Sequence, residues 1–94
     1  MLFAIICHDK KDHGHVRAEN RPVHLDYLKA YADQAYAVGP MLSDDGESML
    51  GSLLILDLAD RAAAEDFAAN DPYNLAGLFE SVTVSRWKKV LPAD

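Results

Sequence analysis

Two residues that lie far apart in the sequence, His24 and Asp71, have side chains that can work together as an acid/base pair. A histidine held by a carboxylate is a general acid or base, because the carboxylate fixes the tautomer of the ring and favours its protonated form. Each residue also has a plainer interpretation. Asp71 precedes Pro72 and can simply cap a short helix, and His24 can be a partly exposed helix residue. The elements that carry the two residues must decide between these interpretations.

Polar side chains close to these two positions are candidates for substrate binding. Arg17 and Arg21 can hold an acidic group at a helix start, where the helix N-terminus also favours negative charge, or they can be solvated in a loop and cap. Tyr73 can donate a hydrogen bond to a phenolate or carboxylate, or it can serve in packing only. Ser43 and Ser52 lack the surroundings of an activated nucleophile, so a serine hydrolase is not expected. Ser52 is kept as a candidate contact at the cleft edge.

Two other groups of reactive side chains are expected to have no chemical role. His8, Asp12, His13 and His15 offer donors that suit zinc, but they show no recognised ligand spacing. We therefore expect no metal there and a solvated segment, which can help to form a lid over the pocket. Cys7 is the single cysteine and lies in an apolar run, which indicates a reduced core thiol rather than a nucleophile.

The composition indicates one soluble globular domain over residues 1–94 and argues against two classes of partner. The net charge is −6, with 15 acidic and 9 basic residues, so neither nucleic acid nor an anionic membrane is expected as the main partner. No run approaches the ~20 apolar residues that span a bilayer. Met1–Cys7 is too short for a signal peptide and lacks a basic leader, so we expect a cytoplasmic protein.

The first half of the chain predicts a strand, a long loop and a helix. The compact apolar run Leu2–Cys7 is typical of a strand buried on both faces, hence central in a sheet. The polar segment His8–Asn20 is expected to be an unusually long loop. Pro22 then indicates the first turn of a helix that is capped by Asn20 or Arg21 and ends near Tyr36. The apolar residues at helical spacing, which form its expected buried stripe, are Leu25, Leu28, Ala32 and Ala35.

The second half predicts a hairpin, a helix and a final strand. Ala37–Leu42 is broken by a Gly-Pro pair and is expected at a sheet edge, and Ser43–Glu47 contains the Asp-Gly signal of a hairpin turn. Met49–Leu58 is a long apolar strand. Asp60 caps the second helix, and Ser81–Leu91 begins with the alternation of a half-buried strand.

This order of elements predicts an α+β fold. Two split βαβ units form a ferredoxin-like βαββαβ sandwich, with an antiparallel four-stranded sheet and both helices on one face. The other face lacks cover within one chain, so we expect a homodimer. Gly51 and Ser52, near the start of the long strand, indicate a bulge or a backbone that another segment crosses closely.

The same topology brings the candidate residues together. The first helix starts where the first strand ends, and the second helix, which runs antiparallel to the first, ends at that same edge of the sheet. His24 and Asp71 are therefore expected at one end of the molecule, with Asp9 and Pro40 from the ends of the first two strands. Pro40 is accordingly a further candidate for contact with a substrate.

Several short motifs in this order resemble a known family. They are Arg21–Leu28, Gly39–Leu42, Gly46, Gly51-Ser52, and Asp71–Tyr73 with Ala76–Leu78. Together they resemble the YCII-related (YciI-like) family over nearly the whole chain, from Phe3 to Trp87. The resemblance implies a ferredoxin-like fold that forms dimeric α/β barrels, no required metal, and a His–Asp pair proposed as the active centre. Carried over to this chain, the pair is His24 and Asp71. At least one relative removes chloride from a hydroxylated aromatic ring, and most have no assigned reaction.

The favoured hypothesis is a small enzyme without an organic cofactor that acts on a small phenolic or carboxylate substrate. His24 would move a proton and Asp71 would orient it, which suits an elimination, lyase or isomerase step. The alternative is a non-catalytic dimeric module that binds a metabolite or another protein, in which Asp71 is only a cap. A third hypothesis is a metal-dependent enzyme that uses the His8–His15 segment.

Overall fold

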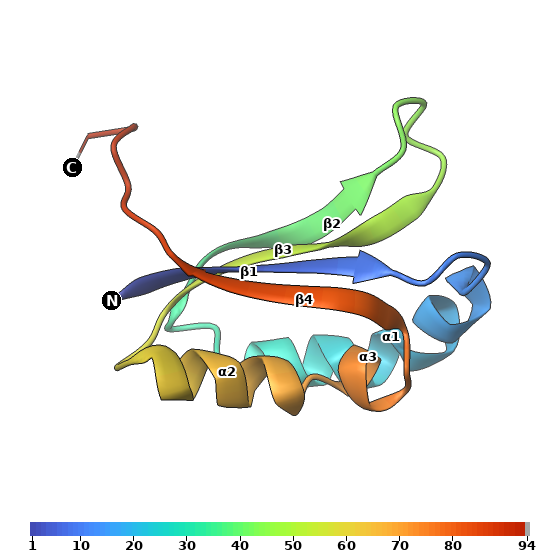
Figure 1. The fold of residues 1–94 in the computed structure, drawn as a ribbon, viewed down its shortest axis with the longest axis horizontal. Coiled ribbons are helices and arrows are strands. Elements are labelled where there is room, and N and C mark those ends of the chain that lie inside the picture. The colour runs from blue at the N-terminus through green and yellow to red at the C-terminus, as the bar shows by residue number, and fades with distance from the viewer. Residues whose placement is uncertain (94) are drawn as a thin grey trace.

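A four-stranded antiparallel sheet with helices packed on one of its faces makes up the fold (Figure 1). In the computed structural model, which describes residues 1–93, the strand order is β2-β3-β1-β4. This confirms the predicted α+β, ferredoxin-like sandwich of the dimeric α/β-barrel class, with one short helix inserted before the last strand. The elements are β1 (Leu2–Asp9), α1 (Gly14–Lys29), β2 (Ala35–Leu42), β3 (Met49–Asp57), α2 (Arg61–Ala69), α3 (Pro72–Leu75) and β4 (Phe79–Arg86).

The hydrophobic core lies between the sheet and the helices. β1 is flanked by β3 and β4, and its residues Phe3 and Ile5 are fully buried. The predicted central position of this strand is thereby confirmed. Removal of such apolar side chains from water is the dominant favourable term in folding. The same core includes Leu54, Leu56, Ala64, Phe67, Ala68 and Leu78.

The helices of residues 1–93 all lie on one side of the sheet (Figure 1), and the opposite face is apolar where β1 pairs with β3. Ile6 pairs with Leu53, and Ala4 pairs with Ile55, across the β1–β3 ladder. Side chains alternate between the two faces of a strand, so these four point away from the helix-covered core. Leu53 remains 37% exposed in the single chain.

The first helix differs from its predicted bounds at both ends. It begins at Gly14 rather than at Pro22, so the expected loop over His8–Asn20 is wrong, and His13 occupies the N-cap in place of Asn20 or Arg21. Pro22 lies inside α1. A proline removes one backbone hydrogen bond from a helix interior, and here the packing of α1 along the sheet outweighs that cost.

The expected buried stripe of this helix is also corrected. Leu25 is 38% exposed, and the buried residues of α1 are Arg17 and His24. α1 ends at Lys29, so Ala32 lies outside it, and Ala35 begins β2 instead. Val16, Tyr27 and Leu28 pack against the core, and the buried positions of the helix are polar.

The second half of the chain follows the prediction closely. β2 is an edge strand, and β3 ends one residue before its predicted limit. Asp60 caps α2, because its Oδ1 accepts a hydrogen bond from the Ala63 N–H at 2.8 Å. β4 begins at Phe79 and ends at Arg86, earlier than expected at both ends. No helix within residues 1–93 is long and apolar enough to cross a membrane.

The predicted close approach at Gly51 is confirmed. A Cβ atom at this position would collide with the backbone carbonyl of Cys7 on β1 and lie 2.7 Å from the Met41 methyl on β2. The β2–β3 register also shifts between Met41 and Leu42, next to the same point. The neighbouring Ser52 is thereby held where β1, β2 and β3 run close together.

Candidate functional site

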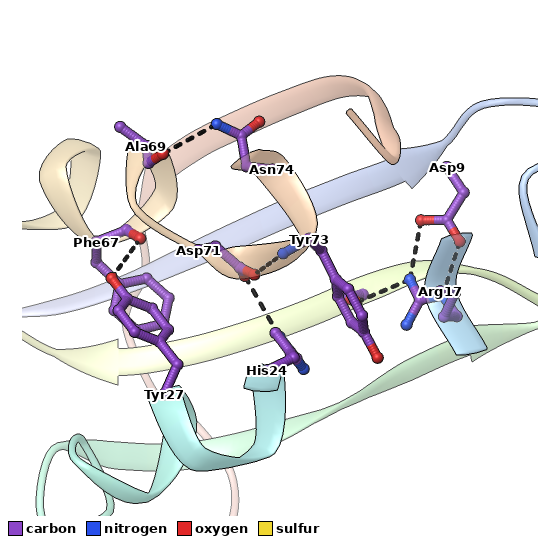
Figure 2. Close-up of polar contacts among 10 residues, drawn as sticks. Asp9, Arg17, His24, Tyr27, Phe67, Ala69, Asp71, Tyr73 and Asn74 are labelled. Atoms are coloured by element: carbon purple, nitrogen blue, oxygen red, sulfur yellow. Dashed lines mark hydrogen bonds and ion pairs between the residues drawn. The ribbon is translucent and has the colours of Figure 1, made fainter. Parts of the chain in front are cut away.

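One face of α1 and the start of α3 supply the polar residues of the candidate site. Arg17, Arg21 and His24 are four and three residues apart, so they follow one another along one face of α1. α3 packs against that helix and contributes Asp71, its N-cap, and Tyr73. Figure 2 shows the side chains of these two elements directed toward one another.

His24 and Asp71 lie in contact, as the topology predicted. The His24 Nε2 atom is 3.3 Å from the Asp71 Oδ2 atom, and the two side chains are 7% and 2% exposed (Figure 2). Nε2 has no aligned hydrogen bond to any described residue, so the contact with Asp71 is a close approach and not a linear N–H···O bond.

Asp71 also caps α3, which confirms the plainer of its two interpretations and does not conflict with its contact with His24. Its Oδ1 atom accepts the Tyr73 N–H at 2.8 Å, while Oδ2 lies toward His24. The cap fixes the carboxylate, because a bidentate group with one oxygen bound to the backbone cannot rotate freely. The helix cap therefore positions the charge that faces the imidazole.

Tyr73 lies between the histidine and an arginine. Its ring stacks on the His24 ring with a centroid distance of 3.8 Å and an interplanar angle of 19°, and the Arg17 Cζ atom is 4.7 Å from the Tyr73 centroid. The tyrosine is 2% exposed. Burial raises the pKa of the Tyr73 phenol, although the nearby Arg17 and Arg21 charges act to lower it.

Arg17 is buried and paired, not solvated in a loop. Its Nε and Nη2 atoms donate to the two carboxylate oxygens of Asp9, each at 2.8 Å, and Nη2 also donates to Ser52 Oγ at 3.1 Å. Burial acts to lower the pKa of Arg17, but the hydrogen bonds and charge of Asp9 outweigh it and raise the pKa. Sequence reasoning had Asp9 at this end of the sheet and missed the pairing, because it had Arg17 in a loop.

A pocket of about 150 Å³ lies against this network, between α1 and the β2–β3 hairpin. All the predicted substrate contacts line it, whereas Asp71 lies behind His24 and Ser43 lies elsewhere. Arg21 is exposed and has no carboxylate partner within the described part of the chain. The apolar wall was missed: Leu25 was expected in the core, and Leu28, which does pack against the core, also lines the pocket. The lining residues are Arg17, Arg21, His24, Leu25, Leu28, Val38, Gly39, Pro40, Met49, Ser52 and Tyr73.

The other reactive side chains occupy different parts of the molecule. Across residues 1–93, no three His, Cys, Asp or Glu side chains are grouped so that they could hold a metal ion. The Nδ1 atom of His13 is 2.7 Å from the Lys11 carbonyl oxygen. Cys7 is buried in the core, and burial, followed by the charges of Asp71 and Asp9, raises the pKa of its thiol to about 12. Such a thiol is a poor nucleophile at neutral pH.

Comparison with known proteins agrees with this arrangement. The model of the YCII-related domain matches residues 1–88. The chain belongs to the YCII-related domain family. Protein YciI of Escherichia coli is 35% identical over 97 aligned residues, which cover 96% of this chain and 99% of that protein. An uncharacterized protein of Haemophilus influenzae is 32% identical over the same coverage.

Two solved structures extend the comparison of this YCII-related chain. The 5-chloro-2-hydroxyhydroquinone dehydrochlorinase TftG of Burkholderia phenoliruptrix AC1100, in complex with 2,5-dihydroxybenzoquinone, superimposes with a TM-score of 0.90. It is 35% identical, and each chain is covered completely. Rv0793 of Mycobacterium tuberculosis superimposes with a TM-score of 0.51 at 16% identity, with 97% and 99% coverage, and shares the fold.

Proposed function

We propose that this chain is a small-molecule enzyme in which His24 transfers a proton and Asp71 orients and charge-balances the imidazole. The observation that supports this most strongly is the 3.3 Å approach of the His24 Nε2 atom to a carboxylate that is itself fixed by a helix cap. His24 lines a pocket that is also lined by Arg21, a cation without a carboxylate partner among the described residues. A proton-transfer group beside an anion-binding group is the arrangement that general acid/base catalysis requires.

The size and wall of the pocket favour a single-ring substrate. A cavity of about 150 Å³ with an apolar lining has room for one benzene ring. Leu25, Leu28 and Val38 supply apolar wall, and Arg21 lies where it can bind an acidic group on the ring. Full-length similarity to TftG, a dehydrochlorinase of a hydroxylated ring, makes a phenolic substrate the first choice.

An elimination fits these residues, because Ser52, which lines the pocket, lacks the surroundings of an activated nucleophile. His24 removes a proton from the substrate, the electrons of the broken bond form a new double bond, and the leaving group departs with the electrons of its own bond. Asp71 stabilises the imidazolium formed in this step. Transfer of the proton back to a different substrate atom gives an isomerisation with the same residues.

The experiment that tests this proposal is a turnover assay with 5-chloro-2-hydroxyhydroquinone, the compound in the name of TftG. We expect His24→Gln to reduce kcat/KM by roughly 10²- to 10⁴-fold, the usual contribution of a positioned acid or base. Unchanged turnover in this variant, with the fold intact by circular dichroism, would remove the proposed mechanism.

A non-catalytic metabolite-binding module is the second candidate. Two observations favour it: the His24 Nε2 atom has no aligned hydrogen bond, and Asp71 already serves as the cap of α3. In this case a bound phenol is recovered unchanged. His24→Gln then alters the affinity of the protein for the phenol, and neither the native chain nor the variant shows turnover. Product analysis after prolonged incubation distinguishes the two candidates.

We also propose that two copies of the chain pair through the open face of the sheet. Leu53 is 37% exposed there beside Ile6, and exposed apolar area of this kind marks an interaction surface. Sedimentation of the native particle tests the proposal, and Leu53→Glu is expected to shift it to the monomer mass.

A cytoplasmic location is proposed as well, because a buried, reduced Cys7 suits that compartment.

A further inference from the structure

The hydroxyl and guanidinium groups that line the pocket are all able to donate a proton. Arg17 and Arg21 are donors only, since a guanidinium has no acceptor. Tyr73 and Ser52 contribute hydroxyl groups, which can donate or accept. No carboxylate of residues 1–93 lines the pocket: Asp71 and Asp9, the partner of Arg17, are both absent from its lining. Apart from the imidazole of His24, which can accept at its unprotonated nitrogen, the polar side chains of the lining can therefore all donate.

Arg17 lies next to both Tyr73 and Ser52 and limits the hydrogen bonds that their hydroxyl groups can donate. Ser52 Oγ accepts from Arg17 Nη2 at 3.1 Å, and the same guanidinium lies 4.7 Å from the Tyr73 ring centroid. Because Arg17 cannot accept a hydrogen bond, neither hydroxyl proton can be directed toward it. Within residues 1–93, neither hydroxyl donates to an acceptor group. Both protons are left for whatever occupies the pocket.

The phenol of Tyr73 is protonated and its ring is fixed in place, as a hydrogen-bond donor requires. Burial raises the pKa of its phenol, so the hydroxyl keeps its proton at neutral pH. Its ring is fixed between the His24 ring at 3.8 Å and the Arg17 guanidinium, and its backbone N–H is bound by Asp71. A donor that is already oriented loses little entropy when its acceptor arrives.

We infer that the pocket is a receptor for one ionised oxygen on a single ring, a phenolate-type oxygen that accepts from the Tyr73 and Ser52 hydroxyls. This deepens the proposed function and rests on its assignment of the pocket to a phenolic ligand. Arg17, locked by Asp9, is the positioning residue of this receptor: it turns the two hydroxyl protons toward the ligand. The ligand is bound as the anion in preference to the neutral phenol.

The probe for this inference is 4-nitrophenol, whose phenolate is yellow while the phenol is colourless. We expect the bound probe to have a lower apparent pKa than the free probe, seen as yellow colour of the bound fraction at a pH where free probe is mostly colourless. Tyr73→Phe and Ser52→Ala should each weaken phenolate binding roughly ten- to a hundredfold, the usual value of a hydrogen bond to a charged group.

Tyr27→Phe is the matched control, because it removes a hydroxyl that donates to the Phe67 carbonyl at 2.9 Å, outside the pocket. It should leave the apparent pKa of the bound probe unchanged. A probe that binds mainly as the colourless phenol, or does not bind, overturns the inference, as does an equal effect of Tyr73→Phe and Tyr27→Phe.

The failure of this inference is distinct from failure of the proposed enzyme. If His24→Gln abolishes turnover while Tyr73→Phe and Ser52→Ala leave the colour of bound probe unaltered, the enzyme proposal stands and the receptor is wrong. If the hydroxyl variants act as expected and no turnover is found, the receptor stands and the chain is a binding module.

Discussion

Two buried pairs flank the ring of Tyr73, and they differ in how well each is satisfied. Arg17 and Asp9 form two aligned bonds of 2.8 Å, and the arginine has a third partner. His24 and Asp71 approach to 3.3 Å without an aligned bond. Any movement of the first pair loses hydrogen bonds, whereas the contact between His24 and Asp71 can rearrange without losing an aligned bond.

The largest effect on turnover is expected from a substitution that separates the two roles of Asp71, its contact with His24 and its cap of α3. Asp71→Asn keeps a good N-cap residue on α3 and removes the charge that faces His24. We expect turnover to fall roughly 10²- to 10⁴-fold with a small change in melting temperature. Asp60→Asn is the matched control, because Asp60 caps α2 in the same way, outside the pocket. Equal effects of the two substitutions on turnover would reduce Asp71 to a cap.

The second prediction breaks the pair of Arg17 and Asp9. Asp9→Ala leaves the Arg17 charge buried without its carboxylate, so we expect a loss of about 3–5 kcal/mol in the free energy of unfolding, measured with urea. Glu65→Ala breaks an exposed pair with Arg61 on α2 and should cost only about 0.3–0.5 kcal/mol. A comparable loss in both variants would contradict the structural role assigned to Asp9.

The smallest effect uses Cys7 as a reporter of both pairs. Burial raises the pKa of its thiol from 9.0 to about 12, and Asp71, then Asp9, add to this shift while Arg17 opposes it. We expect Asp71→Asn to lower the Cys7 pKa more than Asp9→Asn does, because Arg17 partly offsets the charge of Asp9. The chemical shift of the labelled Cys7 Cβ, followed against pH, measures both changes.

The same thiol makes stability depend on alkaline pH. Its pKa is higher in the folded chain than in the unfolded chain, so its contribution is complete below about pH 9 and is lost as pH rises toward about 12. Cys7→Ala should therefore flatten the fall in unfolding free energy over this interval. A steeper fall in the variant would contradict the sign.

The sequence predicted the contact of His24 with Asp71 because that contact depends on topology. The order of strands and helices, and the cap signal of Asp71 before Pro72, fix which ends of the elements meet. The element order and this cap signal can both be read from the sequence, so no knowledge of side-chain packing was needed to predict the contact. The catalytic role assigned to the two residues stays a prediction until turnover is measured.

The sequence did not predict the Arg17–Asp9 pair, because Pro22 was taken for a helix start. The helix runs through this proline for tertiary reasons that no local preference expresses. One signal was available: Arg17, Arg21 and His24 continue a single helical face across Pro22. The loose alignment of the His24–Asp71 pair depends on tenths of an ångström, which residue types cannot convey.

The four-residue helix α3 holds the carboxylate and the aromatic ring of the site within three consecutive positions. Core contacts of the sandwich involve this segment mainly through Tyr73. A chain that exchanges this short piece for another of equal length would acquire a new electrostatic partner for His24 and a new stacking surface in one event, with the sheet unchanged. Divergence of chemistry on this scaffold can therefore proceed by replacement of one small insert.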